Sequence, residues 1–93
     1  MPHVLILHAV ESYPAWKRIF DDAASIRRKA GERSYQLLRE ASDPNHVIHF
    51  SAWTSLEAAR AFFESPGLVK LRQEAGVHAP TFLYLDEIEQ GDL

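Results

Sequence analysis

Residues 46–63 read His-Val-Ile-His-Phe-Ser-Ala-Trp-Thr-Ser-Leu-Glu-Ala-Ala-Arg-Ala-Phe-Phe, and they join a predicted strand to a predicted helix. The first half is rich in β-branched and aromatic side chains, which suit a pleated surface. Thr54 and Glu57 have the spacing of a capping box, so a helix is expected to begin there. Because side chains alternate along a strand, His46, Ile48, Phe50 and Ala52 share one face, and Val47, His49, Ser51 and Trp53 share the other. The second face mixes apolar and polar groups, which is typical both of a lined pocket and of a half-hydrated sheet.

The composition limits the class of protein. A chain of 93 residues is expected to form one domain, covering residues 1–93. The absence of cysteine excludes disulfides and thiolate metal sites, and the net charge of −3 argues against a nucleic-acid partner. The N-terminus has no basic region followed by a cleavage site, and no apolar run approaches the length of a membrane span. We therefore expect a cytoplasmic protein that does not enter a membrane.

The rest of the chain supplies five more elements. His3–Val10 is predicted to be a strand, and because it is apolar on both faces it should lie in the middle of a sheet. A helix is expected from the cap Ser12 to about Ala30, with Trp16, Ile19, Phe20, Ala23 and Arg27 along one stripe and with Arg27, Arg28 and Lys29 forming a solvated end. Further strands are expected over residues 34–40 and 81–89, and a further helix from Pro66 to Gly76, while the helix of the opening stretch is expected over residues 55–63.

The order strand, helix, strand, strand, helix, strand predicts an α+β fold of the ferredoxin-like, split βαβ type. Both helical segments should then cover one face of a four-stranded antiparallel sheet. We place the apolar side chains of Val4, Ile6, Val10, Val47, Trp53, Phe82 and Tyr84 on the opposite face. Because a patch of that size is rarely left bare, a second copy is expected to cover it. The expected assembly is a homodimer whose two sheets enclose a barrel, with a cavity between them.

The sequence resembles the antibiotic biosynthesis monooxygenase-like branch of the dimeric α+β barrel superfamily over nearly the whole chain. The residues that carry the resemblance are Asp43-Pro44-Asn45, Trp53-Thr54-Ser55-Leu56-Glu57-Ala58, Phe62, Ser65-Pro66-Gly67-Leu68 and Gly76-Val77. Most of them are turns, caps and helix-packing positions, so they indicate the fold more than the function. The superfamily includes cofactor-independent oxygenases of polyphenolic rings, heme-degrading oxygenases, polyketide cyclases and proteins without known activity.

The resemblance extends to some functional residues. The quinone-forming oxygenases have the tryptophan matched by Trp53, but they carry an asparagine at the position of His49 and a tyrosine at the position of Ala59. The heme-degrading members have a histidine in the region that here reads Ala61-Phe62-Phe63, so axial heme ligation of that kind is not supported. The resemblance therefore implies a small-molecule enzyme that needs no bound cofactor.

Six residues form the predicted site. His49 and His8 are the candidate catalytic bases, because a neutral imidazole in mid-strand can accept a phenolic proton. Ser51, Trp53, Phe82 and Tyr84 are the candidate substrate-binding residues. The alternative for both histidines is a hydrogen-bonded position in a core, and for Trp53 it is plain packing. Which face of the strand over residues 34–40 lines the cavity is left open.

No metal site is predicted, because His46 and His49 face opposite ways, as do His3 and His8. The function expected from these observations is cofactor-independent oxygenation of a small aromatic or polyketide-like molecule. A polyketide cyclase-like reaction, or a non-catalytic binding or regulatory role for the same dimeric barrel, remains the alternative.

Overall fold

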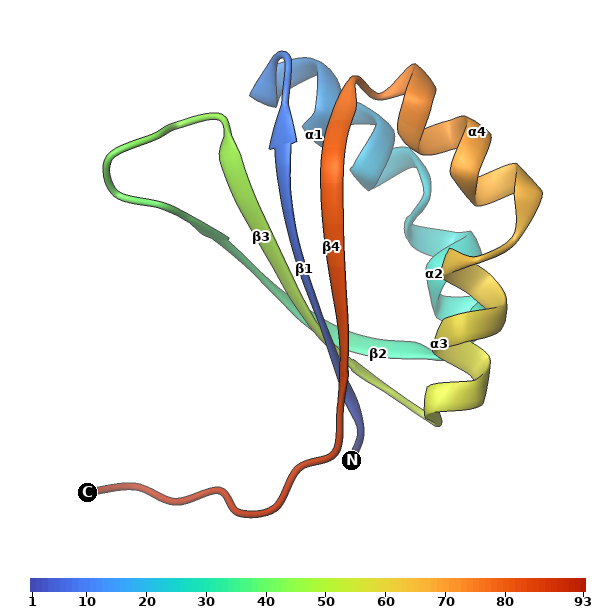
Figure 1. The fold of residues 1–93 in the computed structure, drawn as a ribbon. Coiled ribbons are helices and arrows are strands. Elements are labelled where there is room, and N and C mark those ends of the chain that lie inside the picture. Colours follow the sequence, from blue (N-terminus) through green and yellow to red (C-terminus); the bar gives the residue numbers. More distant parts are fainter.

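The computed structural model describes all 93 residues and shows one antiparallel sheet backed by helices. The strands are β1 (His3–Val10), β2 (Glu32–Arg39), β3 (His46–Trp53) and β4 (Val77–Leu85), in the order β2-β3-β1-β4. The helices are α1 (Tyr13–Asp22), α2 (Ala24–Ala30), α3 (Leu56–Phe63) and α4 (Pro66–Glu74). All of them lie on one face of the sheet (Figure 1). The predicted ferredoxin-like α+β fold is confirmed.

The helix caps explain where the helices begin. The Ser55 hydroxyl accepts a hydrogen bond from the Ala58 backbone N–H at 3.0 Å, so Ser55 caps α3. The predicted capping box placed the cap at Thr54, one residue earlier. Ser65 caps α4 in the same way through the Leu68 N–H. Such a side-chain cap satisfies one of the free N–H groups in the first turn of a helix.

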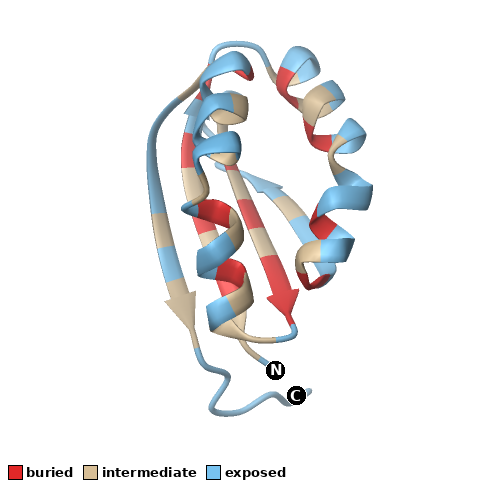
Figure 2. Ribbon diagram, turned by 90° about the vertical axis from the view of Figure 1, so that its right-hand side faces the viewer, coloured by how far each residue is buried: buried red, intermediate tan, exposed pale blue.

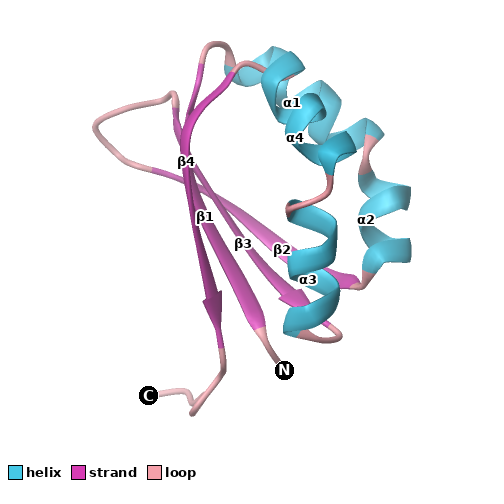
Figure 3. Cartoon of the chain, turned by 45° about the vertical axis from the view of Figure 1, so that its right-hand side comes forward, coloured by secondary structure: helices cyan, strands magenta, loops and turns pink.

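The first helical segment differs from the prediction because it breaks in two at Ala23. No proline or glycine marks the break in the sequence, so the apolar stripe predicted one continuous helix. At the break the Phe20 carbonyl accepts a hydrogen bond from Arg27 Nη1 at 3.0 Å. Arg27 is therefore buried, and its assignment to a solvated helix end is wrong. Figure 2 shows the helices as two columns in front of the sheet, α1–α2 and α3–α4, and Figure 3 shows all four helices on the same side of the sheet.

The assignment of strand faces is also wrong. Alternate residues of β1 and β3, including all of Val4, Ile6, Val10, Val47 and Trp53, are buried under the helices. Phe82 and Tyr84 pack on the same side, against the core formed by Val4, Ile6, Trp53, Ala59 and Phe63. Because both faces of β1 and β3 carry apolar side chains, alternation separates two sets of residues without telling which set the helices cover.

The opposite set forms what we call the open face, consisting of Leu5, Leu7, Leu38, Ile48, Phe50 and Leu83. The register brings these side chains together, since Leu5 pairs with both Phe50 and Leu83, and Leu7 pairs with Ile48. Leu83 is 44% exposed. An uncovered apolar face therefore exists, but it is built from other residues than those predicted. None of the helices is long and apolar enough to cross a membrane.

Candidate functional site

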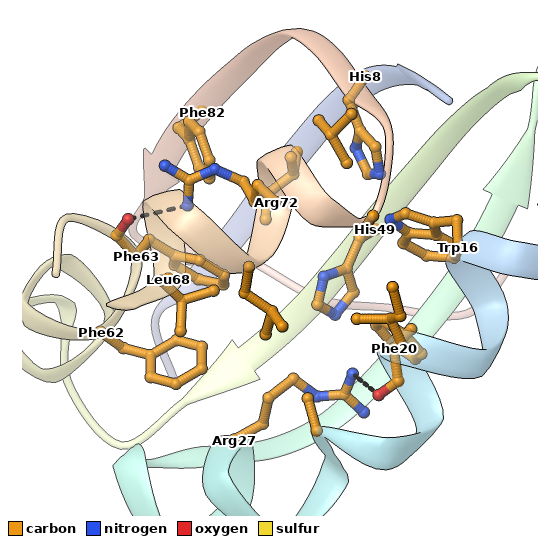
Figure 4. A pocket seen from close by; sticks show the side chains of 16 residues that line it. His8, Trp16, Phe20, Arg27, His49, Phe62, Phe63, Leu68, Arg72 and Phe82 are labelled. Carbon is orange, nitrogen blue, oxygen red and sulfur yellow. Dashed lines mark hydrogen bonds between the residues drawn. The ribbon is translucent and has the colours of Figure 1, made fainter. Parts of the chain in front are cut away.

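A cavity of about 80 Å³ lies between the sheet and the two columns of helices. Its walls are mainly apolar and come from three of the strands and from the helices: His8 from β1, His49 from β3, Phe82 from β4, Phe20 from α1 and Arg72 from α4 (Figure 4). The cavity was predicted between the two sheets of a dimer. It lies instead within the subunit, because the histidine-bearing face of the sheet turns toward the helices.

His49 is held at the cavity by a carboxylate. The imidazole is 3% exposed, and its Nε2 lies 2.9 Å from Glu32 Oε2. The pairing of β2 with β3 brings Glu32, the first residue of β2, beside the end of β3. The Phe20 ring lies edge-on to the imidazole, with 5.0 Å between the ring centroids. His49 is thus a buried imidazole with one nitrogen bound to an acid.

The carboxylate of Glu32 is itself paired. Arg27 Nε lies 2.9 Å from Glu32 Oε1, an ion pair in which the N–H is not aimed at the oxygen as in a hydrogen bond. The guanidinium of Arg27 also sits 3.6 Å above the Phe20 ring centroid. Burial lowers the pKa of Arg27, while the charge of Glu32 opposes that effect. Since an unpaired buried charge is costly, Arg27 and Glu32 stabilise each other as ions.

His8 is the second histidine of the cavity and has no hydrogen bond within the chain. It is 4% exposed, its Nδ1 is buried without a partner, and its nearest aromatic neighbour is Trp16, at 5.3 Å between centroids. Burial is the main cause that lowers its pKa to about 4, with further contributions from His49, His46 and Arg72. His8 is therefore neutral near pH 7. Buried polar groups normally have partners, so a bound molecule is the natural partner for this one.

The lowered pKa of His8 predicts acid sensitivity. Above pH 6.5 the imidazole is neutral in both the folded and the unfolded chain, but between pH 6.5 and about 4 only the unfolded chain binds the proton. The free energy of unfolding should therefore fall as the pH falls, by on the order of 3 kcal/mol. The free energy of unfolding, measured with urea between pH 7 and 4, should fall less in His8→Leu than in the parent. The exposed control His78→Gln should show the same fall as the parent. Equal pH slopes for His8→Leu and the parent would contradict the assignment.

Arg72 brings a cation to the cavity wall. Its Nη1 donates to the Phe63 carbonyl at 2.9 Å, and its guanidinium lies 4.9 Å from the Phe82 ring centroid. No carboxylate forms an ion pair with it. Burial lowers its pKa, against the influence of Tyr84. An unpaired, partly buried guanidinium favours a ligand that carries or develops negative charge.

The predicted site residues divide into two groups. His8, His49 and Phe82 line the cavity, whereas Ser51, Trp53 and Tyr84 do not. The fully buried Trp53 donates from Nε1 to Ser51 Oγ at 2.8 Å, and its ring packs on Phe62 and Phe63. Ser51 and Trp53 therefore belong to the core next to the cavity and not to its walls. Tyr84 lies under the Arg60 guanidinium, at 4.1 Å, and burial raises its pKa.

Sequence reasoning missed Glu32, Arg72 and the role of Arg27. For Arg27 a signal existed, because it continues the apolar stripe of Trp16 and Phe20, where a charge needs a buried partner. Glu32 and Arg72 gave no such signal, since their positions depend on strand pairing and helix packing. No three His, Asp or Glu side chains come together as a metal site requires. The arrangement can bind an apolar ring, accept a proton and stabilise an anion.

Comparisons with known proteins agree with this architecture. A family model described as antibiotic biosynthesis monooxygenase matches residues 11–74. SnoaB, a cofactor-independent oxygenase from Streptomyces nogalater, superposes with a TM-score of 0.76 at 17% identity, covering 96% of this chain and 94% of that chain. A protein from Deinococcus radiodurans gives 0.71 at 16% identity, covering 100% and 98%. At identities this low, the superpositions show a shared fold and nothing further. No curated protein matches the sequence.

Proposed function

We infer that this chain, which belongs to the antibiotic biosynthesis monooxygenase family, oxygenates a small aromatic substrate without a bound cofactor. The observation that carries the proposal is His49, a buried imidazole at an apolar cavity with Glu32 bound to its far nitrogen. A base in that position can remove a phenolic or enolic proton from a ring held beside it. The similarity of fold to SnoaB, a cofactor-independent oxygenase, supports the same class of reaction.

The size of the cavity limits the substrate. A volume of about 80 Å³ is smaller than the engineered cavity of about 150 Å³ that holds benzene in another protein. A single ring therefore fits with a modest outward shift of α4, whose Leu68, Leu71 and Arg72 form one wall and which has no fully buried residue. A fused polycyclic substrate requires a larger displacement of the same helix.

The chemistry begins with proton transfer to His49. The substrate anion is stabilised by the Arg72 guanidinium, and His8 provides a second hydrogen-bonding group for an oxygen of the ring. The electron-rich carbon of the anion reacts with molecular oxygen to give a peroxide. The O–O bond then breaks as a C–H bond of the same carbon is lost, so that one oxygen atom remains as a carbonyl and the other leaves as water. His49 gives its proton back to the peroxide oxygen that leaves as water.

The proposal is tested by a screen of phenols, naphthols and anthrones under air, with oxygen uptake recorded and no metal, flavin or heme added. Oxygen uptake that depends on the protein and on one of these compounds supports the proposal. If none of them is consumed and none binds, the oxygenase assignment fails.

A second candidate function follows from His49 and Ala59, which replace the asparagine and tyrosine of the quinone-forming oxygenases. Ala59 is fully buried and offers no hydroxyl to a ligand. The same cavity could then serve ring closure by proton transfer, or ligand binding without reaction. Product formed without oxygen uptake would indicate cyclisation, and binding without any product would indicate a binding or regulatory role.

Proteins of this family are typically dimeric, and we propose that the open face is where two copies of this chain meet. Four strands about 4.8 Å apart and roughly 26 Å long give roughly 500 Å² on each copy, near the lower limit for a stable interface. A charge introduced on that face should therefore be decisive. Ile6, by contrast, is a core residue, so a carboxylate there would report on folding and not on assembly.

Leu83→Glu is expected to convert the dimer to a folded monomer, because two carboxylates would be buried in the symmetric contact. The matched control is Ile26→Glu on α2, since both side chains are 44% exposed but Ile26 lies outside the open face. Light scattering at micromolar concentration measures the mass. A monomeric parent, or a Leu83→Glu variant that remains dimeric, would contradict the proposed interface.

A further inference from the structure

We propose that Glu32 is a positioning residue that holds His49 in the tautomer with hydrogen on Nε2, leaving Nδ1 as a bare acceptor for the ligand, and that Arg27 holds Glu32 in place. The effect on turnover rests on the proposed function. The tautomer itself does not, because it follows from contacts within the chain. Under this proposal His49 has a fixed tautomer, whereas His8, the other histidine of the cavity, does not.

The tautomer follows from hydrogen-bond chemistry. An ionised carboxylate only accepts, so the 2.9 Å contact between Glu32 Oε2 and His49 Nε2 requires hydrogen on Nε2. A neutral imidazole carries hydrogen on one nitrogen only, so Nδ1 then presents a lone pair. Nδ1 has no hydrogen-bond partner within the chain, and His49 lines the cavity. The free acceptor of His49 is thus available to a ligand.

Arg27 supplies the positive charge that pairs with the carboxylate in a buried place. Glu32 is 5% exposed and Arg27 is 6% exposed, and their side chains are 2.9 Å apart. Arg27 is fixed in turn by its hydrogen bond to the Phe20 carbonyl and by the Phe20 ring beneath it. The guanidinium is therefore anchored independently of Glu32, and it defines where the carboxylate must lie.

The other groups around His49 do not replace this contact. Tyr35 of β2 offers its ring, at 6.2 Å between centroids, and Phe20 of α1 offers only an edge. His8 of β1 and Arg72 of α4 share the cavity, but neither forms a hydrogen bond with His49. Glu32 is the one residue that specifies which ring nitrogen carries the hydrogen. His8, which lacks such a carboxylate, has no fixed tautomer.

The test is Glu32→Gln, read by the nitrogen NMR shifts of the imidazoles in labelled protein. In the parent, His49 is expected to show hydrogen on Nε2 and a bare Nδ1. An amide can donate as well as accept, so Glu32→Gln should produce a mixture or the opposite tautomer. Glu40→Gln is the matched control, because Glu40 lies 2.6 Å from His46 Nδ1 on the surface and its loss should leave His49 unchanged.

Where a substrate is consumed, Glu32→Gln should lower kcat with little change in KM, and Glu32→Asp should restore part of kcat. In serine proteases, the corresponding loss of a carboxylate behind a catalytic histidine costs about ten-thousandfold through the wrong tautomer. A parent His49 with hydrogen on Nδ1 overturns the proposal even if Glu32→Gln fails to fold. An unchanged tautomer in folded Glu32→Gln also overturns it. If no compound is consumed, the oxygenase proposal fails while the NMR result still decides the role of Glu32.

Discussion

His49→Ala is expected to reduce turnover of any phenolic substrate by about a hundredfold to ten-thousandfold, the usual contribution of a positioned general base. His49 is the cavity residue in which a free ring nitrogen is combined with a hydrogen bond to a buried acid. Its loss removes the acceptor for the substrate proton and leaves the apolar walls in place. The decrease should therefore appear in kcat, measured by oxygen uptake, with a smaller change in KM.

His49→Ala needs a control variant that keeps a hydrogen-bond donor for Glu32. His49→Ala leaves Glu32 Oε2 without its hydrogen bond, so part of any loss could reflect lower stability. His49→Gln keeps a donor near the carboxylate but supplies no base, and it should be nearly as inactive as His49→Ala while unfolding closer to the parent. Full activity in either folded variant would show that His49 is not the base.

Trp53→Ala is expected to lower the free energy of unfolding by about 3–5 kcal/mol, the range for removing a large buried aromatic side chain. Trp53 is fully buried and packs on Phe62 and Phe63, with 5.6 and 5.3 Å between ring centroids. Its removal also leaves Ser51 Oγ without its indole donor. A small domain has only about 5–15 kcal/mol of stability, so urea unfolding should show a large shift or an unfolded protein.

Trp53→Phe separates packing from ligand contact. It keeps a ring against Phe63 and loses the indole N–H, so it should cost much less stability than Trp53→Ala. Because Trp53 does not line the cavity, ligand affinity should be nearly unchanged in Trp53→Phe. A strong loss of affinity with little loss of stability would mean that the indole contacts the ligand after all.

The fold could be predicted because its signals are local. The turn residues Asp43-Pro44, the caps Ser12 and Ser65, and the helix ends at Gly31 and Gly76 mark the element boundaries within a few positions. The covered face of the sheet was not predictable in this way. Val4 and Leu5 are about equally apolar, and only the position of the helices, a property of the whole chain, separates the buried Val4 from the open-face Leu5.

The site was predictable in part for the same reason. A histidine in the middle of an apolar strand stands out in the sequence, so His8 and His49 were identified. Glu32 comes directly after Gly31 and precedes the predicted strand, and nothing local shows that β2–β3 pairing places it 2.9 Å from His49. Trp53 stands out as well, but a large aromatic residue gives the same pattern in a core as in a pocket wall.

The most direct test of the proposed function follows the fate of isotopically labelled oxygen gas. The parent protein, treated with a chelator and freed of small molecules, is mixed with a phenol or anthrone identified by the screen, and the product is analysed by mass spectrometry. The account predicts one labelled oxygen atom in each product molecule, formed with the consumption of one molecule of oxygen, and a greatly reduced amount of product with His49→Ala. Product without label, or labelled product formed equally well by His49→Ala, would contradict it.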